Sequence, residues 1–215
     1  MTVTSQPPAD PFAVTSLERL LEVYPLSPAP VALAKESATI LPTHASVIAS
    51  SPFCVISTVG DGGLDQSPRG DRPGFVTVRD DRTLVVPDRR GNNRLDTLRN
   101  VVATGHAGVI FLIPGRDQTL RVNGAACITA DPAVLDRVTP VGKPPRSAIV
   151  VRADEVFAHC PKAFVRSRLW NPDSWPAADE QPSPAEVSHA HMRDPALTVA
   201  DVERQQEESL KHRLA

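Results

Sequence analysis

The stretch PFCVISTVGDGGLDQSPRGDRPGFVTV, residues 52–78, is the part of the chain that decides the fold class. PFCVISTV is typical of an apolar strand, DGG at 61–63 of a turn that tolerates left-handed backbone, and LDQSP of the return strand. A charged Pro/Gly turn, SPRGDRPG, then leads into the alternating strand GFVTV. The stretch therefore predicts successive strands joined by short turns.

Outward from this stretch, the chain alternates further strands with short helices. The other predicted strands are TLVVP (83–87), HAGVIFLI (106–113), TLRVNGAACI (119–128) and SAIVVRADEVF (147–157). The predicted helices lie at 15–24, 43–49, 93–103, 132–138, 160–170 and 198–215, with a linker or wrapping arm at 171–197. Six or seven strands at short spacing, with helices at the periphery, predict a β-rich α+β fold built on a small closed or split β-barrel.

The 215 residues, 41% of them apolar, are enough for one domain with a substantial core. We expect a flexible N-terminus at 1–14, the barrel domain at 15–176 and a C-terminal arm and helix at 177–215. No apolar run is long enough to span a membrane, and MTVTSQPPAD lacks the features of a signal peptide, so a cytoplasmic protein is expected. The three cysteines have no metal spacing; Cys54 and Cys127 lie in apolar runs and are predicted to be buried.

Charge is balanced overall but not locally. The formal net charge of −2 and the pI near 6.3 imply no general attraction to nucleic acid or to an anionic membrane. Residues 69–121, however, contain ten arginines, no lysine and six aspartates, whereas the chain from residue 171 on is acidic. This distribution predicts an anion-binding centre.

The segment TLVVPDRRGNNRLDTLRN, residues 83–100, is the sharpest candidate for that centre. A strand ends at Pro87, and Asn92 or Asn93 is placed to cap the following helix. The amides of a helix N-terminus, together with Arg89, Arg90 and Arg94, suit a phosphate group. The alternative is a capped helix with a solvated basic first turn. Arginines at this end oppose the helix dipole, so an anion is expected beside them.

Two other segments carry arginines near predicted strands. Period-two alternation puts Arg121 and Asn123 on the face opposite Leu120, where a covered arginine needs a partner. Gly124 in the same strand permits close approach of a ligand or of another backbone. In the turn at 67–74, Asp71 either holds Arg69 or Arg72 in a structural ion pair or orients one of them toward a ligand.

A fourth segment, HCPKAFVRSRLWNP at 159–172, is predicted to form a helix with a partly cationic stripe. Lys162, Arg166 and Leu169 recur at spacings of four and three. Trp170 offers a flat apolar surface for an aromatic ring or for an interface. His159 with Cys160, and the HAH sequence at 189–191, do not have the setting of a metal site, so no metal is expected.

The motifs SPRGDRPGFV, PDRRGNNRLDTLRN, FLIPG..TLRVNG and HC.KA..RS.LW, in this order, resemble the pyridoxamine 5′-phosphate oxidase-like flavoproteins, over residues 15–176, and most of all a bacterial FMN-binding branch. The resemblance implies a split-barrel homodimer with FMN in clefts between the subunits and its phosphate at Asn92, Asn93 and Arg94. The 159–172 segment would contact the flavin from the second subunit or form a substrate lid. The candidate cofactor-binding residues are Arg69, Asp71, Arg89, Asn92, Asn93, Arg94, Arg121, Lys162, Arg166 and Trp170.

The activity that the resemblance implies is an FMN-dependent oxidoreductase acting on a small molecule or a nicotinamide donor. The vitamin B6 oxidase itself has a serine-arginine-lysine motif where this chain has Asn92, Asn93 and Arg94, which speaks against pyridoxine phosphate as substrate. No general base is evident, so a non-catalytic FMN carrier or sensor is an alternative, as is the same fold with deazaflavin F420 or haem. Nucleic-acid binding fits poorly, because only nine aromatic residues are present.

Overall fold

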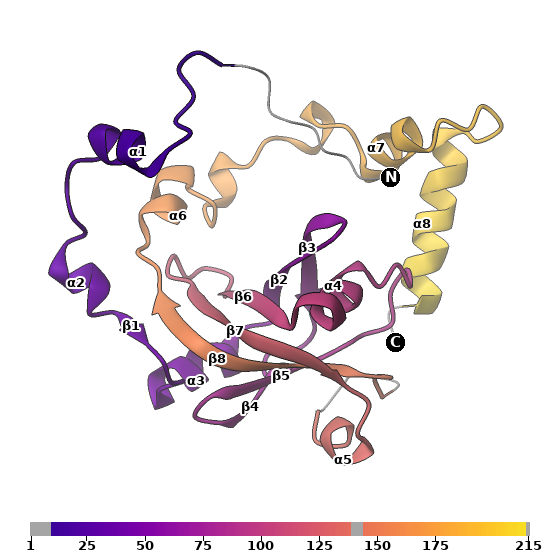
Figure 1. Ribbon diagram of the computed structural model, residues 1–215. Helices are drawn as coiled ribbons and strands as arrows, with labels where there is room; N and C mark the ends of the chain where they lie inside the picture. Colours follow the sequence, from indigo (N-terminus) through magenta and orange to yellow (C-terminus); the bar gives the residue numbers. More distant parts are fainter. Residues whose placement is uncertain (1–9, 139–143, 214–215) are drawn as a thin grey trace.

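The computed structural model describes residues 10–138 and 144–213, and its strands form a single antiparallel sheet (Figure 1). The strands are β1 (Glu36–Ser37), β2 (Phe53–Gly60), β3 (Gly63–Gly70), β4 (Thr77–Asp80), β5 (Thr83–Pro87), β6 (His106–Leu112), β7 (Leu120–Thr129) and β8 (Ala148–Ala158). The helices are α1 (Leu17–Val23), α2 (Pro30–Leu33), α3 (Pro42–Ser50), α4 (Asp96–Thr104), α5 (Pro132–Leu135), α6 (Lys162–Ser167), α7 (Pro184–Met192) and α8 (Val199–Arg213), with 3-10 turns at Pro172–Ser174 and Ala178–Glu180.

The sheet is strongly curved but not closed. Its strand order is β3-β2-β6-β7-β8-β5-β4, and β1 pairs with β8 off this path. The two edges, β3 and β4, are therefore neighbours in the chain but do not pair with each other, which leaves a split in the barrel. This arrangement confirms the predicted β-rich α+β class and its split barrel. The short strand β1 has no counterpart in the sequence prediction, because two residues carry no periodicity.

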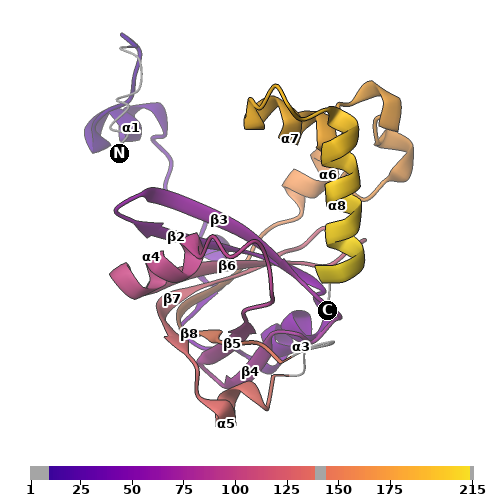
Figure 2. The ribbon, with the colours of Figure 1, turned by 90° about the vertical axis from the view of Figure 1, so that its right-hand side faces the viewer.

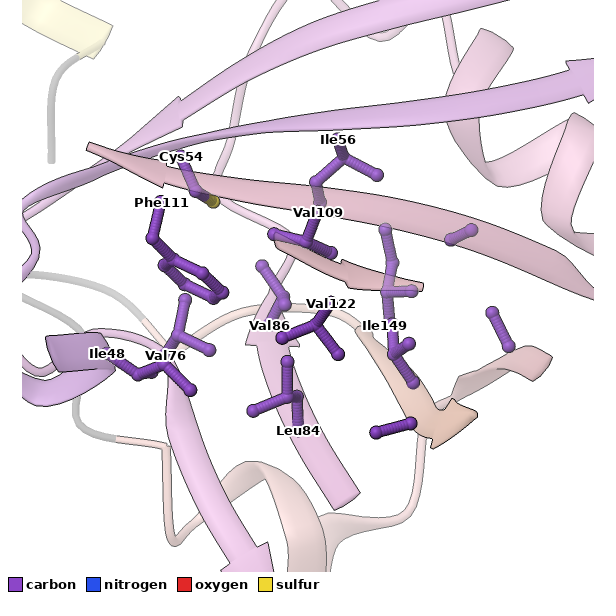
Figure 3. Packing of buried hydrophobic residues seen from close by; sticks show 14 of the residues in the cluster. Ile48, Cys54, Ile56, Val76, Leu84, Val86, Val109, Phe111, Val122 and Ile149 are labelled. Atoms are coloured by element: carbon purple, nitrogen blue, oxygen red, sulfur yellow. The ribbon is translucent and has the colours of Figure 1, made fainter. Parts of the chain in front are cut away.

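The core fills the inside of the barrel (Figure 3). Alternate residues of β2 and β7 point inward, which confirms the period-two pattern predicted for TLRVNGAACI. The largest side chains that are almost fully buried are Phe111, Ile48, Ile56, Leu84, Leu120 and Ile149. Cys54 belongs to this core, but Cys127 is exposed, so the prediction for Cys127 was wrong. The reason is strand parity: Cys127 follows the inward-facing Ala126 and must point outward.

A bulge at Gly124 sets the curvature of the two longest strands. The register between β7 and β8 shifts between Asn123 and Gly124, which leaves Asp154 of β8 without an opposite residue. A Cβ atom added at Gly124 would overlap the carbonyl oxygen of Arg152. Of the two readings of this glycine, the close approach of another backbone is the one observed.

Several helices differ from the prediction. Helix α4 begins at Asp96 rather than near residue 93, and α6 ends at Ser167, followed by Arg168 in the left-handed region. Leu169 therefore lies outside the helix that was expected to carry it. Within the segment predicted as a linker or arm, the structure contains a regular helix, α7, capped by Ser183 and Glu186. The capping-box sequence SPAE was present there to be found.

Two segments leave the barrel, which we name the N-terminal arm (residues 10–35) and the C-terminal extension (residues 161–213). In Figures 1 and 2 both rise on the same side of the barrel and stay apart from each other. Helices α7 and α8 pack together and bury Ala185 and Val202. Among the residues that the structure describes, no helix has both the length and the apolar character needed to cross a membrane.

Candidate functional site

The structure brings two of the arginine-bearing segments together through a crosswise set of ion pairs. Arg69 Nη1 lies 2.8 Å from Asp88 Oδ1, and Arg89 Nε lies 3.1 Å from Asp71 Oδ2. The side chains of Arg69 and Asp88 are 18% and 19% exposed, so the pair is largely shielded from water. The sequence left open a pair of Asp71 with Arg69 or Arg72, and the observed partner is Arg89 instead.

These ion pairs bridge the split of the barrel. In the β2–β3 register Arg69 stands opposite Cys54, whose side chain is completely buried, so both point to the inner face of the sheet. Strand β3 is one edge of the sheet, and Asp88 follows β5, next to the other edge. Burial raises the pKa of the Cys54 thiol to about 12, opposed by the positive charge of Arg69. The guanidinium thus lies close to the barrel interior.

One donor of this cluster has no partner. Arg69 Nε is buried and makes no hydrogen bond within the described part of the chain. An unsatisfied buried donor costs about 1–3 kcal/mol. Such a donor, held in place by an ion pair at an opening of the barrel, is suited to an acceptor that the chain itself does not supply.

The loop that follows β5 is exposed and has an unusual backbone. Asn92 Oδ1 accepts a hydrogen bond from the backbone N–H of Arg94, which forms a local turn. Asn93 and Leu95 have φ values of 64° and 63°, in the left-handed region that residues other than glycine rarely adopt. Backbone strain of this kind concentrates at ligand sites.

The prediction that Asn92 or Asn93 caps the helix was wrong. The N-cap of α4 is Leu95, and no side chain caps it. The amide of Asn92 is engaged in its own turn, which sequence spacing alone does not distinguish from a cap. Arg94 is 75% exposed and donates from Nε to Asp96 in the first turn of α4. The anion expected beside the basic first turn is thus supplied in part by Asp96.

Arg121 lies on the other face of the sheet. It pairs with Glu155, and its guanidinium carbon lies 5.3 Å from the centre of the Phe157 ring. Its Nε is buried and unpartnered within the described residues, as for Arg69. The ring of His159 meets Phe157 edge-on at 5.1 Å between centroids. Burial, and then the charge of Arg121, lower the pKa of His159, while Glu155 partly offsets them.

The residues of the 159–172 segment form a third group, on the C-terminal extension. Lys162 and Arg166 are exposed on α6. The ring of Trp170 stacks on Phe164 at 5.8 Å, and its Nε1 donates to the carbonyl of Arg116 in the β6–β7 loop. The tryptophan thereby ties the base of the extension to the barrel.

Within the described ranges, Arg69 pairs with Asp88 at the split, Arg121 pairs with Glu155 on the other face of the sheet, and Lys162 and Arg166 lie on α6. The predicted residues therefore form three separate groups in one chain. Three further contributors, Asp88, Glu155 and Phe157, were absent from the predicted set. Glu155 and Phe157 could have been predicted from the sequence, because the period-two alternation of β8 places both on the face of the sheet that carries Arg121.

The hollows of the surface lie elsewhere. One, of about 220 Å³, is lined by Thr43, His44, Val47, Arg116, Gln118, Thr119, Leu120 and Ala158. A wider and more open one, of about 490 Å³, lies at the α7–α8 turn. Neither contains a predicted site residue. In residues 10–138 and 144–213, no group of three or more histidine, cysteine, aspartate or glutamate side chains is placed to hold a metal ion.

The fold and the paired arginines at its opening define a split β-barrel protein of the α+β class. The family model described as pyridoxamine 5′-phosphate oxidase matches residues 40–160, more than half of the chain. The chain belongs to the pyridoxamine 5′-phosphate oxidase family. The resemblance noted in the sequence is thereby confirmed at the level of the family.

The solved structures that match part of the chain are distant in sequence. HupZ from Group A Streptococcus is 17% identical, with a TM-score of 0.44 over 55% of this chain and 93% of its own. The FAD binding protein from Mycobacterium smegmatis is 15% identical, with a TM-score of 0.41 over 57% of this chain and 97% of its own. General Stress Protein 26 from Bacillus anthracis is 18% identical, with a TM-score of 0.37 over 53% and 88%. No curated protein matches the chain.

Proposed function

We propose that this protein binds FMN in clefts between two copies of the chain and acts as an oxidoreductase on a small molecule or a nicotinamide donor. The observation that carries the proposal is the buried, unpartnered Nε of Arg69 at the split of the barrel. Membership of the pyridoxamine 5′-phosphate oxidase family supports a flavin as the group that would supply the missing acceptor.

The loop at 88–95 supports a phosphate-bearing ligand. Arg69 and Arg89 are each matched by an aspartate, so their charges are largely offset. Arg90 is exposed, and no carboxylate of the described chain lies within ion-pair distance of it. Arg94 is paired only at the surface, where an ion pair contributes little and is readily exchanged for a better one. The guanidinium groups of Arg90 and Arg94, with the backbone N–H groups of Asn92 and Asn93, would hold the phosphate.

A dimer would bring together the predicted site residues that lie apart within one chain. Arg69 faces the inner side of the sheet at the split, while Arg121 faces outward and Lys162 and Arg166 lie on the extension. In a homodimer, the extension of one chain would bring its α6 and Trp170 to the barrel of the other. The site would then combine Arg69 and Asp71 from one subunit with cationic and aromatic groups from the second.

The chemistry would be divided between ligand and chain. FMN, when bound, supplies two-electron redox chemistry. Arg121, held by Glu155 and by the ring of Phe157, would place a fixed positive charge near a polar edge of the ligand. The ion pairs of Arg69 and Arg89 would orient their guanidinium groups. The three cysteines, none in a disulfide within the described residues, fit the cytoplasmic location that we propose.

The phosphate assignment is tested with Arg94→Ala and two flavins. Loss of one charge-assisted contact to phosphate is worth about 1.5–3 kcal/mol, or roughly 10- to 100-fold in affinity. We expect FMN binding to weaken by this factor and riboflavin binding, which has no phosphate to lose, to stay unchanged, both measured by flavin fluorescence titration. Arg79→Ala, an exposed arginine of β4, is the matched control. Equal losses for FMN and riboflavin would refute the assignment.

A further inference from the structure

The N-terminal arm carries an apolar stripe that no described residue of its own chain buries. Leu17, Leu20 and Leu21 recur at the spacing i, i+3, i+4, which places them on one side of α1, and Tyr24, the C-cap residue, continues the spacing at i+7 directly after the helix. These side chains are 42–67% exposed, and α1 contains no buried residue. Figure 2 shows α1 standing away from the sheet. The stripe has the anchor pattern of a helix that binds a surface.

The helix is well formed locally but too short to persist by itself. Ser16 accepts a hydrogen bond from the backbone N–H of Arg19, and Arg19 pairs with Glu22 at 2.7 Å on the polar side. Helices shorter than about 12–15 residues are marginal in water unless an apolar face packs against something. Seven residues of α1 therefore need a docking surface.

The total accessible surface indicates that the chain leaves more area uncovered than a compact monomer of its size does. The chain exposes 15,042 Å², whereas a folded monomer of 23.1 kDa exposes about 9,700 Å². Counting the residues outside 10–138 and 144–213 as fully extended, at ~160 Å² each, accounts for only about half of the difference. About 2,800 Å² of excess surface remains on the chain, more than the ~800 Å² that each partner of a standard interface buries.

We propose that the N-terminal arm docks on a second copy of this chain, with the Leu17–Leu20–Leu21–Tyr24 stripe as its contact surface. The inference rests on the dimer of the proposed function and adds a segment to it. A second copy is favoured over a foreign partner because the arm rises on the same side of the barrel as the C-terminal extension, which carries the groups assigned to the partner's site. The N-terminal arm of each chain would then pack against the barrel of the other chain.

The test compares two double variants of the full-length chain. L20Q/L21Q makes the stripe polar without adding charge and keeps good helix formers. E18Q/E22Q changes the other side of the same helix and breaks the Arg19–Glu22 pair. Each protein is mixed with its ¹⁵N-labelled counterpart, and the rate of subunit exchange is followed by native mass spectrometry. This readout works even where the dimer is too tight for a dissociation constant.

The expected result is a dimeric wild type in which L20Q/L21Q speeds exchange on the order of 10- to 100-fold while E18Q/E22Q exchanges like wild type. A dimeric wild type whose exchange is unchanged in L20Q/L21Q would overturn the docking of the arm and leave the dimer standing. A wild type that is monomeric at all concentrations would overturn the arm and the dimer together. Lower unfolding stability of L20Q/L21Q with unchanged exchange would place the arm on its own barrel, against the proposal.

Discussion

Phe111, in the barrel, is 1% exposed, whereas Leu17, in the N-terminal arm, is 66% exposed. Both are large apolar side chains in regular secondary structure. The barrel buries its side chains among strands that are distant in sequence, so one chain completes that core by itself. Helix α1 of the arm has the pattern of a packed helix, but no described residue of its own chain buries it. The contrast shows that the same kind of side chain is buried in the barrel and exposed in the arm.

Among substitutions in the barrel and in the N-terminal arm, the largest loss of unfolding free energy is expected in the barrel core. Phe111→Ala removes a buried aromatic ring and should lower the free energy of unfolding by about 3–5 kcal/mol. Leu26→Ala, in the arm, removes a side chain that is 88% exposed and should change it by less than about 0.5 kcal/mol. Urea denaturation of both variants checks this. Similar losses would show that the arm belongs to the cooperative core.

A smaller effect is expected at the split of the barrel. Asp88→Ala leaves Arg69 charged and without its partner on the inner face, which should cost about 2 kcal/mol, below the 3–5 kcal/mol of a fully buried pair because this one is partly exposed. Arg94→Ala breaks an ion pair at the surface and should cost less than about 0.5 kcal/mol. Thermal or urea unfolding measures both. A silent Asp88→Ala would mean that the split is solvated rather than held by charge.

The smallest effect is expected where the C-terminal extension leaves the barrel, at His159. Its pKa is lowered in the folded state, chiefly by burial, so the unfolded chain takes up a proton first as the pH falls. Protonation of His159 in the unfolded chain therefore lowers the free energy of unfolding as the pH drops below the ordinary histidine pKa of about 6.5. His159→Gln should reduce the pH dependence of the unfolding free energy between about pH 7 and pH 5.

The matched control is His191→Gln, an exposed histidine of α7. The comparison concerns the slope with pH rather than the level, because losing the contact with Phe157 lowers stability at every pH. An unchanged slope in His159→Gln would mean that the imidazole is as accessible as in the unfolded chain.

The fold was predictable because its signal is local. The apolar run PFCVISTV predicted one strand, the alternation in TLRVNGAACI predicted another together with its inward face, and the Gly-rich turn at 61–63 predicted the first hairpin. The error at Cys127 came from treating an apolar run as buried throughout, although one outward position separates each pair of inward ones.

The candidate site was less predictable because it depends on which strands become neighbours. The pairing of Arg69 with Asp88 follows from the curvature that brings both ends of the sheet to the split, and no spacing in the sequence encodes that distance. The prediction that Asn92 caps α4 was wrong for another reason. An asparagine side chain bonds equally well to a nearby turn amide, and the left-handed backbone of Leu95 moved the helix start to Asp96.

The central claim is that this barrel binds FMN, and the most direct measurement is an absorbance spectrum of the purified protein with mass spectrometry of whatever it releases on denaturation. The purified protein is expected to show flavin bands at roughly 370 and 450 nm and to release the mass of FMN, or to gain both after incubation with FMN. A colourless protein that also fails to bind added FMN would contradict this claim. Release of haem or of a deazaflavin would keep the barrel as a cofactor site and contradict the choice of FMN.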